Sequence, residues 1–217
     1  MPNFFASLAI FGGTSNTICI MSIHAFRMRL GEVATIKAGY PFRGAVENIQ
    51  GAPVRAVQMK DMDPLEGIDW SGVIHTRLSG RREADWLLRD DLLFVSRGTR
   101  FYATCLDAPP PHAVCGPHLF HLRVKAPSEL IPAFLAWQIN QPPFQRALGR
   151  AAEGSSQLSL RRPVLEALPV GIPSAADQQR IVQLARLALR ERHLQDQLIR
   201  NRERLFESIA ESLAGTA

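Results

Sequence analysis

The spacing of apolar residues divides the chain into three parts. From Leu30 to about Pro173, short apolar runs alternate with Gly, Pro and Asp, a pattern typical of a mixed α/β domain with many loops. After Pro173, neither Gly nor Pro occurs until Gly215, which predicts one long helix. We therefore expect a leader over 1–27 that is an over-extended start or a loosely ordered arm, a domain over 28–173 and a long helix over 174–217.

Within the domain, short apolar runs predict strands, and longer runs of helix-forming residues predict helices. Pro132 suits the first turn of a helix, and the run of prolines from Pro109 to Pro111 predicts a stiff connection between strands. The predicted strands are Val54–Met59, Leu92–Ser96, Phe101–Leu106, Leu119–Val124 and Leu168–Ile172, and the predicted helices are Ile131–Asn140 and Phe144–Arg150.

The predicted long helix carries a stripe of large apolar residues. Ser174 can cap its start, and Asp177 falls in its first turn. A helix of roughly 38 residues extends about 57 Å, farther than a domain of this size can cover. The stripe repeats every 11 residues, which suits a nearly straight partner, so we expect it to pair with another chain or another such helix. Its members are Leu187, Leu194, Leu198, Leu205 and Ile209.

Composition narrows the choice of partner and compartment. The formal net charge of +5 and the pI of about 9.6 favour a polyanion, although basic proteins without such a partner are also common. Only three of the 25 Lys and Arg residues are lysines. Arginine can hold phosphate or a guanine edge through two parallel hydrogen bonds, but GC-rich codon usage explains the bias equally well.

Cysteine content and hydropathy favour the cytoplasm. Three cysteines at irregular spacing do not make a disulfide scaffold, which indicates a reducing compartment. No apolar run reaches the roughly 18 residues that a membrane span requires. A signal peptide is not expected, because no Lys or Arg precedes Arg27.

The segment Asn140-Gln141-Pro142-Pro143-Phe144 nearly spells the Asn-Pro-Pro-Phe motif of amino-group methyltransferases. In that motif a polar side chain directly before two prolines holds the target amine. Here Gln141 takes that place, and no strand followed by a Gly-x-Gly turn precedes it to bind a nucleoside cofactor. A proline turn between two helices is the better interpretation.

A group of cysteines and histidines has the residue types of a zinc site. The segment Leu119–Val124 is predicted as a strand, and a strand starting at His118 would place His118 and His121 on opposite faces. A pair of small buried cysteines with loop and strand histidines is therefore the favoured interpretation, and we expect no metal. The group comprises Cys105, His112, Cys115, His118 and His121. Nucleotide hydrolysis is also not expected, because no lysine follows a glycine as a phosphate-binding loop requires.

Several segments, in order, resemble the target-recognition domain of type I restriction-modification S subunits. The opening of the family's domain is resembled here by Leu30–Ala34 followed by Gly39–Phe42. The family's internal strand and turn are resembled by Asp90–Thr99. The end of the family's domain is resembled here by Gly154–Ser159, followed by Leu165–Val170 and Ile172-Pro173. The start of the family's spacer helix is resembled by Asp177–Val182. The resemblance extends from about Leu30 to Leu213, and the order and spacing of the segments carry it.

The resemblance implies a non-catalytic, sequence-specific DNA-binding subunit without cofactor. A full S subunit repeats the unit of domain plus helix, and its two helices pair antiparallel so that each domain reads half of a bipartite site. Methylation and cleavage belong to separate methyltransferase (M) and restriction (R) subunits. One unit here implies a half-size subunit that pairs with a second S unit, or a fragment of a longer chain.

We expect loops of the domain to read bases while other contacts hold phosphates. Candidate residues stand near glycine-marked turns or strand ends, where loops project from a rigid scaffold, and Arg97 and Arg100 are the strongest pair. The candidates are Tyr40, Arg43, Arg55, Gln58, Lys60, Arg97, Thr99, Arg100, Tyr102, Ser156 and Gln157.

Two other functions stay open at this point. The chain could be an adaptor whose long helix docks on a partner protein. Its arginines would then form only a solvated face, and the domain would not read DNA sequence. The second of these is an orphan methyltransferase or nuclease, and the missing catalytic motifs argue against it.

Overall fold

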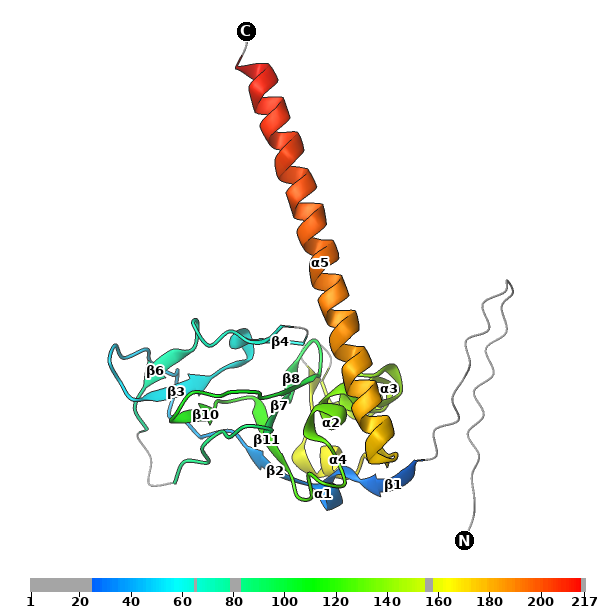
Figure 1. Ribbon diagram of the computed structural model, residues 1–217. Helices are drawn as coiled ribbons and strands as arrows, with labels where there is room; N and C mark the ends of the chain where they lie inside the picture. Colours follow the sequence, from blue (N-terminus) through cyan, green and yellow to red (C-terminus); the bar gives the residue numbers. More distant parts are fainter. Residues whose placement is uncertain (1–24, 65, 79–82, 155–157, 216–217) are drawn as a thin grey trace, which may run out of the picture.

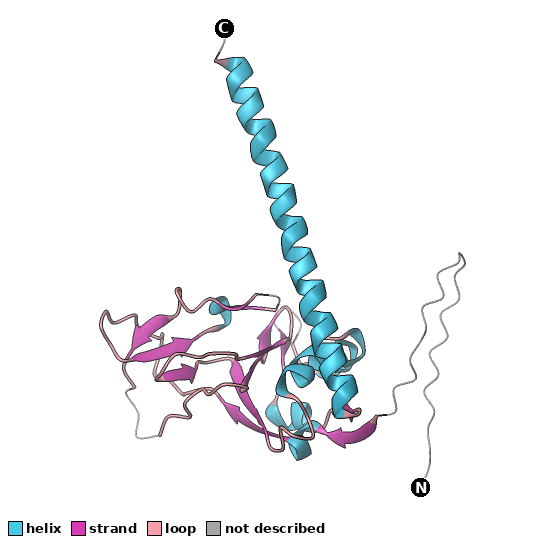
Figure 2. Cartoon of the chain, viewed as in Figure 1, coloured by secondary structure: helices cyan, strands magenta, loops and turns pink. Residues whose placement is uncertain are grey.

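The computed structural model describes residues 25–64, 66–78, 83–154 and 158–215. It has a mixed α/β architecture with one long C-terminal helix, which confirms the fold class that the sequence predicts (Figures 1 and 2). The strands are β1 Phe26–Arg29, β2 Ala34–Ala38, β3 Val54–Val57, β4 Met62–Asp63, β5 Gly67–Ile68, β6 Ile74–Thr76, β7 Leu92–Val95, β8 Arg97–Gly98, β9 Ala103–Cys105, β10 Ala113–Cys115, β11 Leu119–Val124, β12 Leu158–Ser159 and β13 Pro169–Ile172. The helices are α1 Leu30–Val33, the 3₁₀ turn η1 Met59–Asp61, α2 Pro132–Ile139, α3 Pro142–Ala151, α4 Arg162–Glu166 and α5 Ala175–Ala214.

A four-stranded antiparallel sheet in the order β2-β11-β7-β9 forms the centre of the domain. Successive residues of a strand point to opposite faces, so Leu92 and Phe94 of β7 face one side and Leu93 and Val95 face the other. All four are buried, which means that both faces of the sheet are covered. β7 therefore reads as a continuous apolar run and not as an alternating one.

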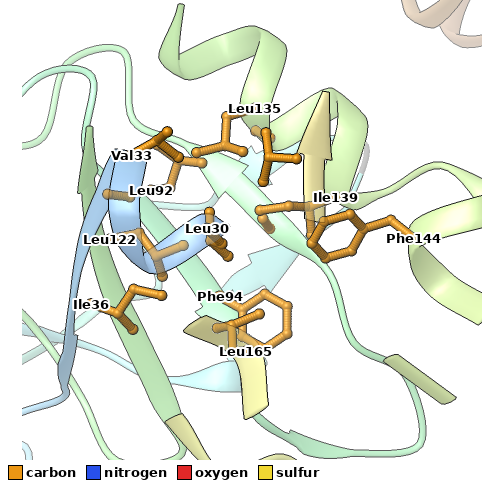
Figure 3. Close-up of a cluster of buried hydrophobic side chains, with 14 of the residues drawn as sticks. Leu30, Val33, Ile36, Leu92, Phe94, Leu122, Leu135, Ile139, Phe144 and Leu165 are labelled. Carbon is orange, nitrogen blue, oxygen red and sulfur yellow. The ribbon is translucent and has the colours of Figure 1, made fainter. Parts of the chain in front are cut away.

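Short helices cover one face of this sheet. Their apolar side chains converge with those of β2, β7 and β11 into the largest buried cluster, shown as sticks in Figure 3. Phe94 and Phe134 are the largest fully buried side chains, and each such residue contributes about 1.5–3 kcal/mol of burial. The other face packs on residues of β3, β10 and the segment around Met62.

A second sheet, in the order β10-β3-β6, joins the first through a close crossing of backbones. A Cβ atom placed on Gly39 would lie 1.8 Å from the carbonyl oxygen of Gly116, so only glycine fits there. The adjacent Tyr40 N–H donates to the carbonyl of Cys115 at 2.7 Å. The glycine of the Gly-Tyr-Pro-Phe segment is therefore required by this close approach of two backbones.

The two ends of the domain meet in the antiparallel pair β1-β13, where Phe26 lies opposite Ile172. The expected boundary after residue 27 therefore falls inside β1. Residues 1–24 of the expected leader lie outside the described residues.

Helix α5 begins where the sequence predicts. Ser174 is the N-cap, and its Oγ accepts from the backbone N–H of Asp177 at 3.2 Å. Figure 1 shows α5 leaving the domain beside α2 and extending well beyond it. Gln178 is the only fully buried residue of its described length. None of the helices in the described part of the chain combines the length and apolarity that crossing a membrane requires.

Candidate nucleic-acid interface

The connection from β7 to β9 projects a short segment that contains three of the predicted residues. Its base is fixed because the Ser96 backbone N–H and Oγ both donate to the carbonyl of His118, at 3.0 and 2.8 Å. Gly98 follows with φ of +139°, a conformation that L side chains rarely adopt. Arg97, Thr99 and Arg100 are exposed around this turn. A buried strand thus presents an exposed arginine-containing turn.

This turn borders a cleft of about 320 Å³, which we call the arginine cleft. Gln58 is the N-cap of η1, and its backbone N–H donates to Asp61 Oδ2 at 2.8 Å. This bond ends β3 at Val57, so the strand is shorter than the predicted Val54–Met59. Through Met59 the turn brings Gln58 and Lys60 next to the cleft. The cleft lining comprises Met59, Met62, Asp63, Pro64, Val95, Arg97, Gly98, Thr99, Arg100 and Tyr102.

Tyr102 fixes the opposite wall of the arginine cleft. Its hydroxyl donates to the carbonyl of Met62 at 2.9 Å, which ties the end of η1 to the start of β9. Burial raises the pKa of Tyr102, and the nearby carboxylate of Asp63 raises it further while Arg100 lowers it. The residue therefore stays a neutral phenol at physiological pH.

The other predicted residues do not line the arginine cleft. Tyr40 is 7% exposed, and its ring contacts Phe42 edge-on at 4.9 Å between centroids. Arg43 is exposed in the loop after β2, and Arg55 is half-buried on β3 opposite His75. Ser156 and Gln157 lie outside the described residues.

The near-motif of Asn140, Gln141 and two prolines forms the junction between α2 and α3. Asn140 Oδ1 accepts from the Ala103 N–H at 2.9 Å, and Asn140 Nδ2 donates to the Ala103 carbonyl at 2.8 Å. The Gln141 side-chain amide donates to the Trp137 carbonyl at 3.0 Å, and Phe144 is buried. These contacts join the helices to the edge of β9, which agrees with the turn interpretation.

The residues of the zinc-like group are distributed over different elements. Cys105 lies on β9 and Cys115 on β10, and His112 and His118 occupy turns with positive φ. Burial raises the pKa of the Cys105 thiol to about 12 and also raises that of Cys115. Across the described residues, no three His, Cys, Asp or Glu side chains are arranged to hold a metal ion.

A buried charged group that the sequence analysis did not single out lies at the start of β7. Asp91 is 1% exposed and accepts two hydrogen bonds from Arg123, at 2.6 and 2.7 Å, and one from the Leu88 N–H at 2.7 Å. His121 Nε2 lies 2.8 Å from Asp91 Oδ2. Burial alone would raise the pKa of Asp91, but these donors outweigh it and lower the pKa to about 2. His121 and Arg123 share one face of β11 because they are two residues apart.

The predicted apolar stripe of α5 is solvent-exposed along its whole length. Its five members are 46–67% exposed, and Leu184, Ile199, Phe206 and Leu213 add to the exposed apolar surface. The half-buried residues of α5 that pack toward the domain, including Val182 and Ala185, lie on a different side. With about 100° of rotation per residue, Leu187 lies roughly 200° around the helix from Ala185. The stripe therefore faces away from the domain.

Three solved structures share this fold. The S subunit of a type I restriction-modification system from M. genitalium aligns with 76% of this chain and 39% of its own, with a TM-score of 0.52 and 15% identity. The HsdS subunit from Thermoanaerobacter tengcongensis aligns with 82% and 40%, with a TM-score of 0.52 and 16% identity. The chain has an S-subunit fold.

A chain from a structure on complex assembly and conformational transition of the type I restriction-modification system gives the same result. It aligns with 82% of this chain and 41% of its own, with a TM-score of 0.56 and 16% identity. The chain thus spans about two fifths of the length of the S subunits that it matches. No protein-family model and no curated protein matches the sequence.

Proposed function

We propose that this chain is a sequence-specific DNA-recognition subunit of a type I restriction-modification complex. The observation that carries the proposal is the S-subunit fold over 76–82% of the chain. In this proposal residues 28–173 bind double-stranded DNA and residues 174–217 form the spacer and dimerisation helix. The subunit works in the cytoplasm, without catalysis of its own.

The arginine cleft is the proposed centre of base reading. Arg97 and Arg100 flank Gly98 on a turn held rigidly at Ser96, so their guanidinium groups can approach base edges while the backbone stays fixed. Arginine commonly reads guanine through a bidentate contact in the major groove. Thr99 lines the same cleft and supplies a further polar contact, and Gln58 and Lys60 flank Met59, which also lines it.

The exposed stripe of α5 is the proposed contact with a second S unit. An antiparallel pair places the two recognition domains at opposite ends and staggers the arginines that flank the stripe, whereas a parallel pair in register would place like charges together. Two identical copies related by this two-fold axis would read inverted half-sites. M and R subunits then methylate or cleave the DNA that the pair selects.

Selection of binding sequences from randomised duplexes tests the DNA proposal. The chain is used together with a type I M subunit, and enrichment of a bipartite sequence is the expected result. Arg97→Gln or Arg100→Gln should cost about 1–3 kcal/mol at one base pair of the selected site and leave the other positions unchanged. Arg89→Gln is the matched control, because Arg89 pairs with Asp107 at the end of the β7–β9 strand pair that lies opposite the arginine turn.

Two results would contradict the proposal. If no sequence is enriched, the chain is not a specificity subunit. If both arginine variants select the wild-type site with wild-type affinity, base reading takes place outside the arginine cleft.

A further inference from the structure

A groove of about 620 Å³ lies between the first turns of α5 and the domain. Residues from the β7–β9 connection, α2 and the start of α3 form one wall, and α5 residues from Val182 to Arg192 form the other. The side of α5 next to α2 can be followed in Figure 1. We call this space the helix groove.

Three arginines line the helix groove. Arg100 comes from the domain, and Arg186 and Arg192 come from α5 one to two turns apart. The lining contains no carboxylate, and none of the three makes an ion pair with a described acidic residue. The acidic Glu66 contacts His193 at 3.7 Å and is not part of the lining. Like charges around one space repel each other, and a bound polyanion relieves that repulsion.

The helix groove continues into the arginine cleft. Pro64, Arg100 and Tyr102 line both spaces. A chain of phosphates that passes the base-reading turn can therefore reach Arg186 and Arg192 by way of Arg100. Arg100 stands at the junction of the two.

The helix groove stays accessible when α5 pairs with a second helix. Val182, Ala185 and Leu189 lie on the groove side of α5, whereas Leu187 and Leu194 lie on the outward stripe. A helix that covers the stripe leaves the groove side uncovered. Pairing and groove binding can thus occur together.

We propose that the helix groove binds the phosphate backbone of the DNA duplex beside the bases that the arginine cleft reads. This inference rests on the proposed function. Arginine holds phosphate through parallel hydrogen bonds from its planar guanidinium group, which suits a nucleic-acid backbone. The direct continuity with the arginine cleft favours DNA over an acidic polypeptide. Spacer helix and domain therefore bind one duplex jointly, and α5 fixes the register of the domain on DNA.

The salt dependence of binding to a labelled duplex of random sequence tests this inference. Each phosphate contact contributes about 0.9 to the slope of log affinity against log salt concentration. Arg186→Gln with Arg192→Gln should therefore reduce the slope by about 1.8. Arg186→Lys with Arg192→Lys should keep most of it, because lysine also binds phosphate as a point charge. Fluorescence anisotropy gives the affinities, and thermal unfolding shows that all variants are folded.

Arg200→Gln with Arg204→Gln is the control, since both arginines are exposed on α5, outside the groove lining and not adjacent to the leucine stripe. Each of the two double glutamine variants lowers the net charge from +5 to +3, that is, 5 minus 2. The control should keep the wild-type slope. If the groove variant keeps the wild-type slope, or the control loses as much as the groove variant, the helix groove does not hold phosphates.

Labelled polyglutamate tests whether the helix groove binds an acidic polypeptide instead of DNA. If the groove variant binds the duplex like wild type but loses affinity for polyglutamate, the groove accepts an acidic polypeptide and the inference is wrong. A wild-type chain that binds no duplex, random or selected, overturns the proposed function itself. A wild-type chain that selects its site while the groove variant keeps its slope overturns only this inference.

Discussion

The recognition domain and helix α5 obtain their stability in different ways. The domain buries three apolar clusters and covers both faces of its central sheet. Helix α5 spans 40 residues, and its only fully buried residue is Gln178. The domain can fold on its own core, whereas α5 exposes large apolar residues that only another surface can cover. A long helix of this kind depends on tertiary or quaternary packing more than on intrinsic helix propensity.

The largest expected effect comes from disrupting the proposed contact between the exposed stripe of α5 and a second S unit. Leu194→Asp with Leu205→Asp places four charges in each two-helix contact and removes roughly 6 kcal/mol or more of apolar burial per dimer. Light scattering should show a dimer for the wild type at tens of micromolar and a monomer for the variant. The domain should unfold at the wild-type temperature. A wild-type monomer that gains no mass with an M subunit, or a variant that assembles like wild type, contradicts the pairing.

The next effect concerns the charged group inside the domain. Asp91→Asn removes the carboxylate that holds Arg123 and His121, and breaking a buried ion pair on one side costs about 3–4 kcal/mol. The cost lies in the lower part of the usual range because Arg123 is half-exposed and therefore partly solvated. Asp90→Asn is the control, because Asp90 is exposed with φ of 68° and asparagine tolerates that conformation. Urea unfolding measures the difference, and equal stability of both variants would contradict a structural role for Asp91.

Asp91 also gives the domain a defined dependence on pH. Its pKa is about 2 in the folded chain, against an ordinary value of 3.8. A carboxyl group with a lowered pKa in the folded state stabilises the fold above its unfolded pKa, and this contribution is lost as the pH falls from about 4 through about 2. Wild-type stability should therefore fall over this interval more steeply than that of Asp91→Asn. Parallel curves for the two proteins would assign the acid sensitivity to other groups.

A smaller effect is expected where the two regions meet. Gln178 Oε1 accepts from the Ile131 N–H at 2.8 Å, and Nε2 donates to the carbonyls of Glu129 and Pro173 at 2.8 and 2.9 Å. Gln178→Leu removes the side-chain partner of these backbone groups, two before α2 and one before α5, and should cost about 2–3 kcal/mol. Gln179→Leu, at an exposed neighbouring position, should cost far less. If thermal unfolding gives the same loss for both, Gln178 does not join α5 to the domain.

The elements that the sequence predicts well are those that local chemistry fixes. Strand β11 has the predicted bounds Leu119–Val124, and α2 begins at Pro132 because proline lacks the N–H that a first turn leaves unbonded. Helix α5 begins after its Ser174 cap as predicted. In each case the signal lies within a few residues of the element.

The elements that sequence reasoning missed depend on distant partners. β1 forms because Phe26 lies opposite Ile172, and no local pattern in the leader indicates that pairing. The predicted strand Phe101–Leu106 is shorter, at Ala103–Cys105, because its register with β7 covers only these three residues.

The candidate site shows the same division. Glycine and arginine at the β7–β9 turn are visible in the sequence, and the structure brings Arg97, Thr99, Arg100 and Tyr102 to one cleft. Arg186 and Arg192 line the neighbouring helix groove because α5 passes beside the β7–β9 connection, and no local sequence pattern indicates that position. Their position on the side of the helix away from the leucine stripe was the signal that could have indicated a separate role.

The smallest expected effect concerns the first turn of α5. Ser174 Oγ accepts from the Asp177 N–H and donates to Asp177 Oδ2, so Ser174→Ala removes an N-cap worth about 1 kcal/mol. Because Gln178 holds the next turn to the domain, the loss should increase amide hydrogen exchange only in the first turn and leave the rest of α5 unchanged. Ser174→Asp should restore protection, since aspartate also caps helices. Faster exchange along the whole helix in Ser174→Ala would mean that α5 unfolds from its capped end, and that Gln178 does not separate the junction from the exposed part.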